Sequence, residues 1–236
     1  MNCAEGVAVS FWPVAGETNA YIIKDAEGHV FGYGESGGTL LSANATEENA
    51  HWTLRTRADL ISGLDGATIE NQKDATFLIS DPQFGKDNRL FNEKWQGDAL
   101  EKAGSDDNTH ASVNKDATGK FNAYQDLGED LPNGVYELSV QGFYSSSTSD
   151  KRCAYFYANS EAMALKNISS IAQQPAGEDE ASTAFTDGNY QCSTLRFLVI
   201  NNKIRIGVKG VYGECGWTAF DNFRLMYLGP TSQLNH

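Results

Sequence analysis

The sequence predicts an all-β protein, built as an antiparallel β-sandwich that follows a small β-rich unit and one short helix. Many short segments alternate apolar and polar residues, turn signals separate them at intervals of about 8–12 residues or somewhat more, and almost no stretch has a helical period. The last of these segments is the clearest. From Phe223 onward, Phe223, Leu225 and Tyr227 fall on one face and the residues between them on the other. A period of two over this length is typical of a strand, and a final strand can only close a sheet that is already formed.

The first part of the chain is predicted to be a small β-rich unit, residues 1–66. Residues 7–54 hold short strand signals with turns between them, including a hairpin over residues 21–31. About 50 residues of this kind cannot bury much apolar surface alone. The clearest helix covers residues 56–64, because Thr56 can cap it and Asp59 falls in its first turn.

Residues 74–229 are predicted to form the sandwich, and residues 230–236 a tail. One strand is expected to open it over residues 74–80 and to stop at the Asp-Pro pair that follows. Residues 172–189 read as a long loop of acidic and small residues. The other predicted strands cover residues 121–127, 135–144 and 153–158, and residues 195–209 form a hairpin. In the strand 135–144, Tyr136, Leu138 and Val140 face one way.

Composition and charge exclude several classes of function. The chain has 236 residues with 40% hydrophobic content, so a real core is feasible, and its formal charge is −13. That sign repels a phosphate backbone, so nucleic acid is not an expected partner, whereas mostly neutral polysaccharides are compatible with it. No run of about 18 apolar residues is present, so no membrane span is expected. No signal peptide is visible, so the chain is either cytosolic or a mature piece of a secreted protein.

The cysteines and histidines indicate neither a zinc site nor a catalytic triad. The four cysteines form no C-x-x-C pair, and the four histidines are scattered. Cys192 and Cys215 could form a disulfide, with separate buried thiols as the alternative. With 31 carboxylates, chance pairs of acids are certain, so no pair marks a glycosidase. We therefore expect no enzyme.

Three segments together resemble a known family. Residues 131–144 (LPNGVYELSVQGFY), 154–160 (AYFYANS) and 217–225 (WTAFDNFRL) are similar in order and spacing to the galactose-binding-like β-sandwich, or jelly-roll, modules of secreted bacterial polysaccharide-degrading proteins. These modules are relatives of carbohydrate-binding modules. Residues 79–84 resemble their Asn-Pro-x-Phe opening strand, with Asp81 in place of Asn and Gly85 where an acidic residue is common. The resemblance covers about residues 74–229.

This resemblance implies a non-catalytic carbohydrate-binding module, extracellular or at the cell surface. Its partners would be a polysaccharide or oligosaccharide and a catalytic domain in the same parent chain. One fold hosts many functions, however. A structural or adhesive accessory module that mediates protein–protein or inter-domain contacts is the alternative, and a small glycosidase is a third reading.

Binding a sugar needs flat aromatic platforms beside polar side chains, because sugar rings present an apolar C–H face and a rim of hydroxyls. The candidates are aromatic residues outside the core. On the strand 153–158 Phe156 belongs to the core face, which leaves two tyrosines on the other. The alternative is that both sheet faces are covered and that the rings pack inside the protein. This alternative is expected above all for Trp217, which lies beside the closing strand. The candidate rings are Trp95, Tyr144, Tyr155, Tyr157, Tyr212 and Trp217.

The resemblance also implies a structural calcium ion. Asp221 lies just inside the final strand, where such modules often hold Ca²⁺ with backbone carbonyls, and Asp81 on the first strand could join it. Calcium takes six to eight oxygen ligands. The alternative is that Asp221 accepts hydrogen bonds from backbone amides in a turn.

Overall fold

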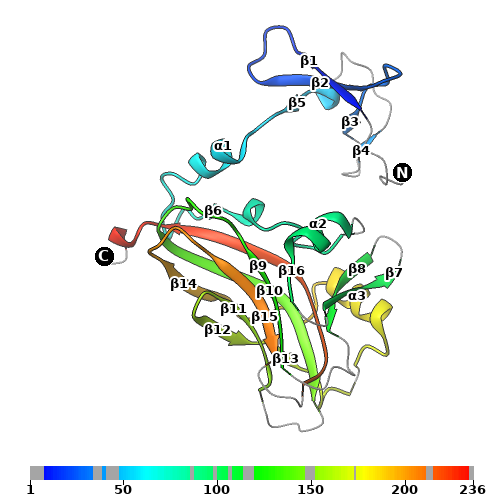
Figure 1. The fold of residues 1–236 in the computed structure, drawn as a ribbon, viewed down its shortest axis with the longest axis vertical. Helices are drawn as coiled ribbons and strands as arrows, with labels where there is room; N and C mark the ends of the chain where they lie inside the picture. The colour runs from blue at the N-terminus through cyan, green and yellow to red at the C-terminus, as the bar shows by residue number, and fades with distance from the viewer. Residues whose placement is uncertain are drawn as a thin grey trace. The chain divides into compact units, whose positions relative to one another are not determined.

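The computed structural model describes residues 8–33, 39–40, 48–85, 88–97, 100–105, 108–113, 120–146, 152–172, 174–210 and 215–233. The chain divides into two compact units, Met1–Leu60 and Ile61–His236. Each unit is described by itself (Figure 1).

The N-terminal unit is a small set of strands with little core. Strands β1 (Val9–Pro13), β2 (Ala20–Asp25) and β5 (Trp52–Thr53) form an antiparallel sheet in the order β1-β2-β5, and β3 (Gly32–Tyr33) pairs with β4 (Thr39–Leu40). A 3₁₀ turn, η1, covers Glu48–Ala50. All five residues of β1 are exposed. The buried apolar residues of the N-terminal unit, among those described, are Ala20, Val30 and Ala50.

The predicted helix near the end of this unit is confirmed as α1 (Arg57–Ser62). Thr56 and Asp59 cap its first turn reciprocally. The Asp59 backbone amide donates to Thr56 Oγ1 at 3.1 Å, and the Thr56 amide donates to Asp59 Oδ2 at 2.8 Å. This capping box satisfies amides that the first helical turn leaves without partners.

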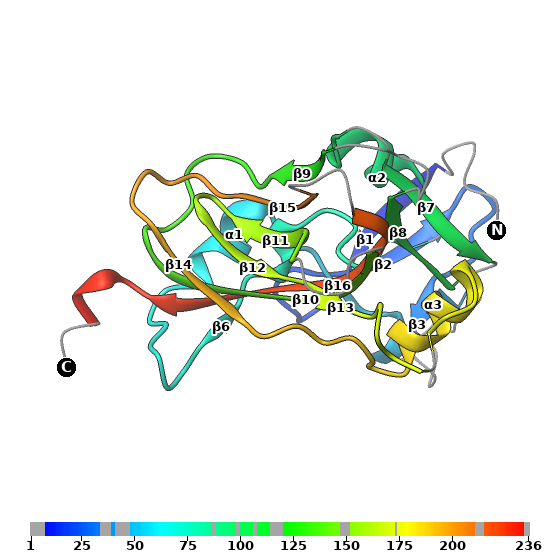
Figure 2. The same cartoon turned by 90° about the horizontal axis from the view of Figure 1, so that it is seen from below.

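The second unit is the predicted antiparallel β-sandwich (Figures 1 and 2). Its two sheets pair antiparallel throughout, apart from the short parallel pair of β10 and β13. The larger sheet has the order β13 (Lys166–Asn167), β10 (Gly134–Ser146), β16 (Cys215–Gly229), β8 (Asn108–Val113) and β7 (Leu100–Ser105), with β14 (Leu195–Val199) beside β10 and β6 (Lys73–Asp74) beside β16. The smaller sheet has the order β12 (Glu161–Ala164), β11 (Ala154–Ala158), β15 (Arg205–Gly210) and β9 (Phe121–Asp126). The predicted hairpin over residues 195–209 is therefore wrong, because β14 pairs with β10 and β15 pairs with β11 and β9.

The core between the sheets follows the predicted alternation. Tyr136, Leu138 and Val140 of β10 are all buried in it, as are Leu225 and Tyr227 of β16. The same parity that the sequence shows therefore decides which side of each central strand is apolar.

A bulge interrupts the alternation of β16. The register between β10 and β16 shifts between Ser139 and Gln141, and Asn222 adopts a left-handed backbone conformation with φ of 51°. Asn tolerates this conformation better than most residues. As a result Phe220 and Phe223, three residues apart, both lie in the core.

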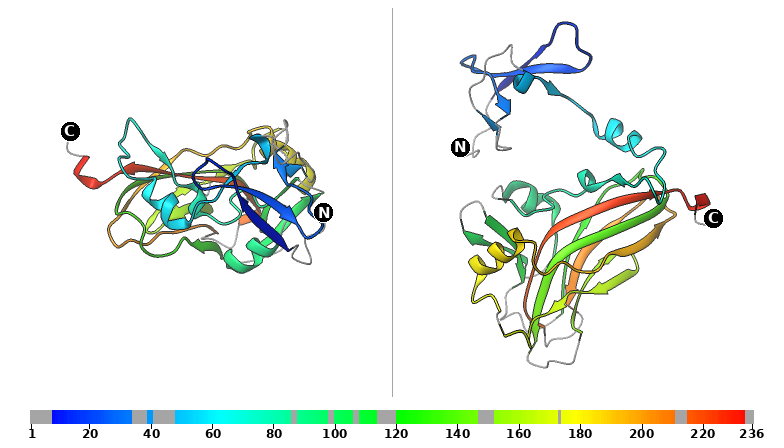
Figure 3. Two further views of the ribbon diagram at one scale, coloured as in Figure 1. Left: turned by 90° about the horizontal axis from the view of Figure 1, so that it is seen from above. Right: turned by 180° about the vertical axis from the view of Figure 1, so that it is seen from behind.

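Helix α3 (Glu178–Thr186) packs on the other face of the larger sheet, against β7, β8 and β16 (Figure 3). It buries a second apolar cluster, which consists of Phe143, Ile168, Ala181, Phe185 and Ala219. The prediction of a loop over residues 172–189 is therefore wrong in its central part. Three acidic residues in the first turn favour a helix there, because they complement the helix dipole.

The segment that opens the sandwich also differs from its prediction. In this segment the short strand β6 pairs with β16, and a 3₁₀ turn, η2 (Thr76–Leu78), then takes the place of the expected strand over residues 74–80. The turn forms because Asp74 Oδ1 accepts a hydrogen bond from the Thr76 amide at 2.8 Å. A further unpredicted helix, α2, covers Asn88–Lys94, and a last 3₁₀ turn, η3, covers Thr231–Gln233. In the described part of the chain, no helix is long and apolar enough to cross a membrane.

The disulfide joins Cys153 to Cys215, whose Cα atoms lie 5.5 Å apart. Neither possibility considered from the sequence is correct, because Cys215 pairs with Cys153 and not with Cys192. Cys153 directly precedes β11 in the small sheet and Cys215 begins β16 in the large sheet, so the bond links the two layers. Cys192 is a buried free thiol whose Sγ lies 3.4 Å from the Gly142 carbonyl oxygen.

Candidate functional site

The outer face of the small sheet gathers polar and aromatic side chains in two cross-strand rows. In the first row, Tyr155 of β11 lies opposite Lys209 of β15, which lies opposite Asn122 of β9. The alternate residues of these strands are buried, so the named ones face away from the core. The second row crosses Tyr157, Gly207 and Tyr124, and next to it Arg205 lies opposite Asp126. We call these eight residues the small-sheet face.

Tyr157 lies flat across the small-sheet face. Its hydroxyl donates to Asn122 Oδ1 at 2.8 Å, two strands away. The ring passes over Gly207, where a Cβ atom would come within 2.8 Å of Tyr157 Cε1 and within 2.2 Å of the Ala123 carbonyl oxygen. Only glycine leaves room for this arrangement. Tyr157 is 5% exposed, and burial raises the pKa of its hydroxyl.

Two cations cover the rings of the second row. Lys209 Nζ lies 4.8 Å from the centroid of the Tyr157 ring, and Arg205 Cζ lies 4.3 Å from that of Tyr124. Both distances are in the range of cation–π attraction. Arg205 also holds Asp126 through two hydrogen bonds of 2.7 Å. Hydrogen bonds from this guanidinium lower the pKa of the Asp126 carboxyl.

Tyr155 has a more open ring. It is half-buried, its hydroxyl donates to the Arg152 carbonyl oxygen at 3.1 Å, and no cation of the described residues covers it. A hollow of about 340 Å³ adjoins the far end of the face, where Asp126 and Arg205 meet Asn159 and Lys203. The face thus offers one partly open ring, two cations and an amide beside a polar hollow.

The predicted ring residues divide between this face and the interior. Tyr155 and Tyr157 lie together on the small-sheet face, whereas Trp95 and Tyr144 are 5% and 1% exposed and belong to the core. The Trp95 indole N–H donates to the Ser80 carbonyl oxygen at 2.9 Å. Because these two rings pack against protein, they present no flat face to a ligand. Their core placement matches the alternative that some rings are structural.

Trp217 lies away from the small-sheet face. Trp217 is half-buried on the α3 side of the large sheet, where its ring lies 4.9 Å from that of Phe143 and its N–H donates to Ser112 Oγ at 3.1 Å. Tyr212 lies outside the described residues.

Six members of the small-sheet face were not among the predicted site residues. Each lies on a strand whose position the sequence predicts, and they are Asn122, Tyr124, Asp126, Arg205, Gly207 and Lys209. Applying the period of two to the segment 121–127 would have placed Asn122 and Tyr124 outside the core. The capping of rings by cations, however, depends on cross-strand register, which the sequence does not reveal.

The two predicted calcium ligands are engaged within the protein. Asp81 Oδ1 accepts a hydrogen bond from the Gly85 amide at 2.7 Å, and its Oδ2 lies 3.2 Å from Lys102 Nζ. The Lys102 ammonium also donates to the Gly85 carbonyl oxygen, and its side chain is 8% exposed. The Lys102 ammonium therefore already neutralises the Asp81 carboxylate and binds the neighbouring Gly85 carbonyl oxygen.

Asp221 does not complete a calcium site either. Its Oδ1 accepts a hydrogen bond from the Asn222 amide at 2.7 Å, which is the alternative expected from the sequence. Burial raises the pKa of the Asp221 carboxyl to about 8; the amide of Asn222 opposes this rise, and the nearby charge of Asp81 adds to it. A protonated carboxyl is a poor calcium ligand. As folded, this group of side chains does not fit a calcium ion.

A histidine, a serine and a glutamate meet under α3. His110 Nδ1 lies 2.7 Å from Ser182 Oγ, and His110 Nε2 lies 2.8 Å from Glu178 Oε2. The order serine–histidine–carboxylate is that of a catalytic triad, but the two ring nitrogens have exchanged partners relative to the usual arrangement. His110 is also 0% and Ser182 1% exposed, so no substrate can reach the hydroxyl. The three side chains instead tie β8 to α3.

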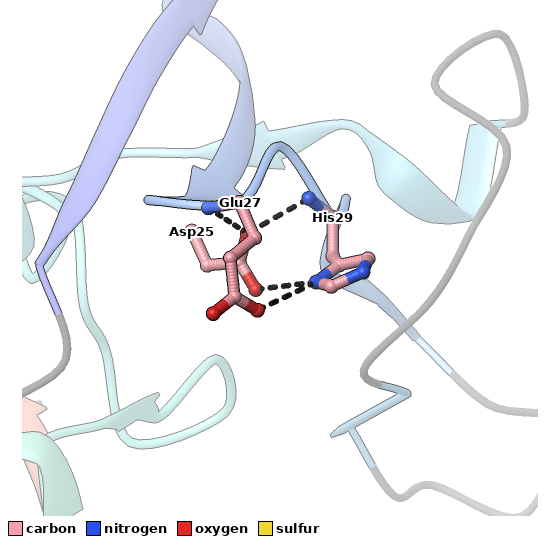
Figure 4. A group of neighbouring side chains, drawn as sticks. All are labelled: Asp25, Glu27 and His29. Carbon is pink, nitrogen blue, oxygen red and sulfur yellow. Dashed lines mark hydrogen bonds and ion pairs between the residues drawn. The ribbon is translucent and has the colours of Figure 1, made fainter.

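An exposed cluster in the N-terminal unit is explained by its turn. Asp25 Oδ1 accepts hydrogen bonds from the amides of Glu27 and His29, and Asp25 Oδ2 lies 2.8 Å from His29 Nδ1 (Figure 4). The hydrogen bond with Asp25 raises the pKa of His29. Such bonds are usual where an aspartate stabilises a turn, and the cluster needs no ligand.

A second hollow region lies on the outer side of the large sheet. Two hollows of about 670 and 510 Å³ share Gln83 and Asn222 in their walls. Most of their other lining residues are polar. The aromatic ones are Phe185 and Phe223, both buried, so this groove has no ring on which a sugar could stack.

Comparisons with known proteins give structural neighbours alone. No protein-family model matches the chain, and no curated protein matches it. A family 61 carbohydrate-binding module in complex with β-1,4-galactotriose is similar at 14% identity and a TM-score of 0.39, over 64% of this chain and 97% of that one. A family 35 carbohydrate-binding module from Clostridium thermocellum has 10% identity and a TM-score of 0.35, over 58% and 94% of the chains.

An enzyme is also among the neighbours. A cyclase from Fischerella sp. TAU has 12% identity and a TM-score of 0.39, over 68% of this chain and 98% of that one. What these proteins bind or catalyse is a property of those proteins. The ligand of this chain has to be inferred from its own side chains.

Proposed function

We propose that the sandwich is a non-catalytic glycan-binding module and that the small-sheet face is its binding surface. The observation that carries this proposal is the grouping of three tyrosines with Lys209, Arg205 and Asn122 on one solvent-facing side of a sheet. A sugar ring can pack its C–H face on Tyr155, and its hydroxyls can reach the polar groups of the same row.

The proposed setting is extracellular or at a cell surface. A disulfide between the sheets supports it, because disulfides persist in oxidising compartments. One partly open ring and a few hydrogen bonds would give weak binding at a single site. Weak binding is useful when it keeps a catalytic domain in the same parent chain near its substrate.

The experiment compares Tyr155→Ala with a matched substitution elsewhere. Tyr21 is also half-buried and lies in the sheet of the N-terminal unit, so Tyr21→Ala controls for the loss of a tyrosine. Titration calorimetry and affinity electrophoresis across plant, host and microbial glycans should show at least one ligand for the wild type. Tyr155→Ala should weaken it about tenfold, the loss expected for one stacking contact. A wild-type chain that binds none of the glycans contradicts the proposal, as does turnover of an aryl glycoside that a carboxylate variant abolishes.

A second candidate function, an adhesive or protein-contact module, rests on the N-terminal unit. Strand β1 is the edge of its sheet, and it exposes 48% of Phe11 and 54% of Trp12. An exposed apolar edge strand can pair with the same strand of a second copy. Sedimentation velocity should then show concentration-dependent dimers that Phe11→Asp removes, and a strictly monomeric wild type would exclude this function.

A further inference from the structure

Apart from the Asp126 carboxylate, which Arg205 already engages, the polar groups that the small-sheet face offers to a ligand are mainly hydrogen-bond donors. Tyr157 lies beneath Lys209, and Tyr124 lies beneath Arg205, so a cation covers the outer face of each ring. Asn122 Oδ1 already accepts the hydrogen bond of Tyr157, which leaves its Nδ2 group as a donor. A ligand that meets this layer therefore has to bring acceptors.

Lys209 and Arg205 differ in whether a carboxylate of the protein already neutralises their charge. Arg205 is neutralised by its two hydrogen bonds to Asp126. Lys209 forms no ion pair with a carboxylate of the described residues, and it lies between Tyr155 and Asn122 in one cross-strand row. The row therefore places an unpaired ammonium and a free amide N–H₂ side by side, next to the one partly open ring.

We propose that the ligand is an acidic polysaccharide whose uronate carboxylate binds Lys209 and Asn122 while its sugar ring packs on Tyr155. This inference rests on the proposed function and names its ligand class. Two adjacent donor groups match the two oxygens of a carboxylate, and a charge-assisted hydrogen bond is about twice as strong as a neutral one. A neutral glycan would offer the ammonium hydroxyl oxygens but no opposite charge.

The single positive charge in excess on the small-sheet face separates this ligand from nucleic acid. The formal net charge is −13, and Arg205 and Lys209 with Asp126 leave the face only one positive charge in excess. Binding a nucleic acid depends on neutralising several phosphates. One unpaired ammonium can recognise a single sugar carboxylate, but it is too few to neutralise the several phosphates that a duplex presents.

The test titrates the full chain with polygalacturonate, dextran sulfate, neutral β-1,4-galactan, neutral xylan and duplex DNA. Polygalacturonate should bind most tightly, and Lys209→Met should weaken it at least about tenfold, the effect of losing one charged hydrogen bond. Arg224→Met is the matched control, because it removes an exposed cation from the outer side of the large sheet, beside the groove. It should leave the affinity unchanged.

The possible results separate this inference from the proposed function. Equal or tighter binding of a neutral glycan that Tyr155→Ala weakens would overturn the acidic ligand and leave the glycan-binding function standing. A preference for dextran sulfate or DNA would also overturn it, as would binding that depends on Arg224 and not on Lys209. No binding to any polysaccharide would contradict both proposals.

Discussion

Breaking the bond between Cys153 and Cys215 should lower the free energy of unfolding of the sandwich by about 4 kcal/mol. The two cysteines are 62 residues apart in sequence. In the chain-entropy model a closed loop of that length removes roughly 14 cal/mol/K from the unfolded ensemble, which is about 4 kcal/mol at 25 °C. At the usual sensitivity of a domain of this size, the melting temperature should fall by roughly 8–16 °C.

The assay is urea unfolding of the wild type with and without a phosphine reductant, followed by tryptophan fluorescence. The double variant Cys153→Ala with Cys215→Ala should match the reduced wild type and should no longer respond to the reductant. Cys192→Ala is the control, since its thiol is free. If Cys192→Ala cost as much as the double variant, or if reduction changed nothing, the assigned pairing and the entropy argument would both be refuted.

Three further perturbations test other parts of the structure. A chelator or added Ca²⁺ should not shift the melting temperature of the wild type, and a saturable rise with Ca²⁺ would argue for a calcium site. Lys102→Met should lower the free energy of unfolding by about 3 kcal/mol, because Asp81 loses its buried partner. Burial holds the pKa of His110 below its ordinary value of 6.5 despite the opposing effect of Glu178, so its contribution to stability is complete above pH 6.5 and declines as the pH falls below it. The midpoint of urea unfolding should fall as the pH is lowered below 6.5, and His110→Gln should remove this pH-dependent step. Gly207→Ala should destabilise by roughly 1–3 kcal/mol, because its Cβ would crowd the Ala123 carbonyl oxygen and the Tyr157 ring. It should also weaken glycan binding, and a variant with unchanged stability would show that this position does not need glycine.

The sequence predicts the central strands well because each is paired along its length. Phe223, Leu225 and Tyr227 alternate in the sequence and lie in the core, as do the alternating residues of β10. The alternation of side chains along a strand depends on the backbone alone, so the face of each residue can be predicted without knowing the partner strand. Tyr155 and Tyr157 were placed outside the sandwich core by the same rule, and they lie on the small-sheet face.

What the sequence could not predict depends on contacts between distant segments. The pairing of Cys153 with Cys215 follows from the meeting of β11 and β16, and four cysteines allow several connectivities. Trp95 reads as a loop ring, but a hydrogen bond to Ser80 holds it in the core. Likewise, Lys102 is 21 residues from Asp81, and no local pattern joins an edge-strand lysine to a carboxylate in the opening turn.

Helix α3 has a consequence for how the specificity of such a protein could change. Where α3 covers the larger sheet, β10 and β16 are buried on both sides, so almost any exchange there disturbs packing. The small sheet differs in this respect. The outward-facing residues of β9, β11 and β15 can be substituted, because their inward-facing neighbours keep the core intact. A combinatorial library confined to those outward positions is therefore the natural starting point for selecting new ligands on this scaffold, with Gly207 kept fixed.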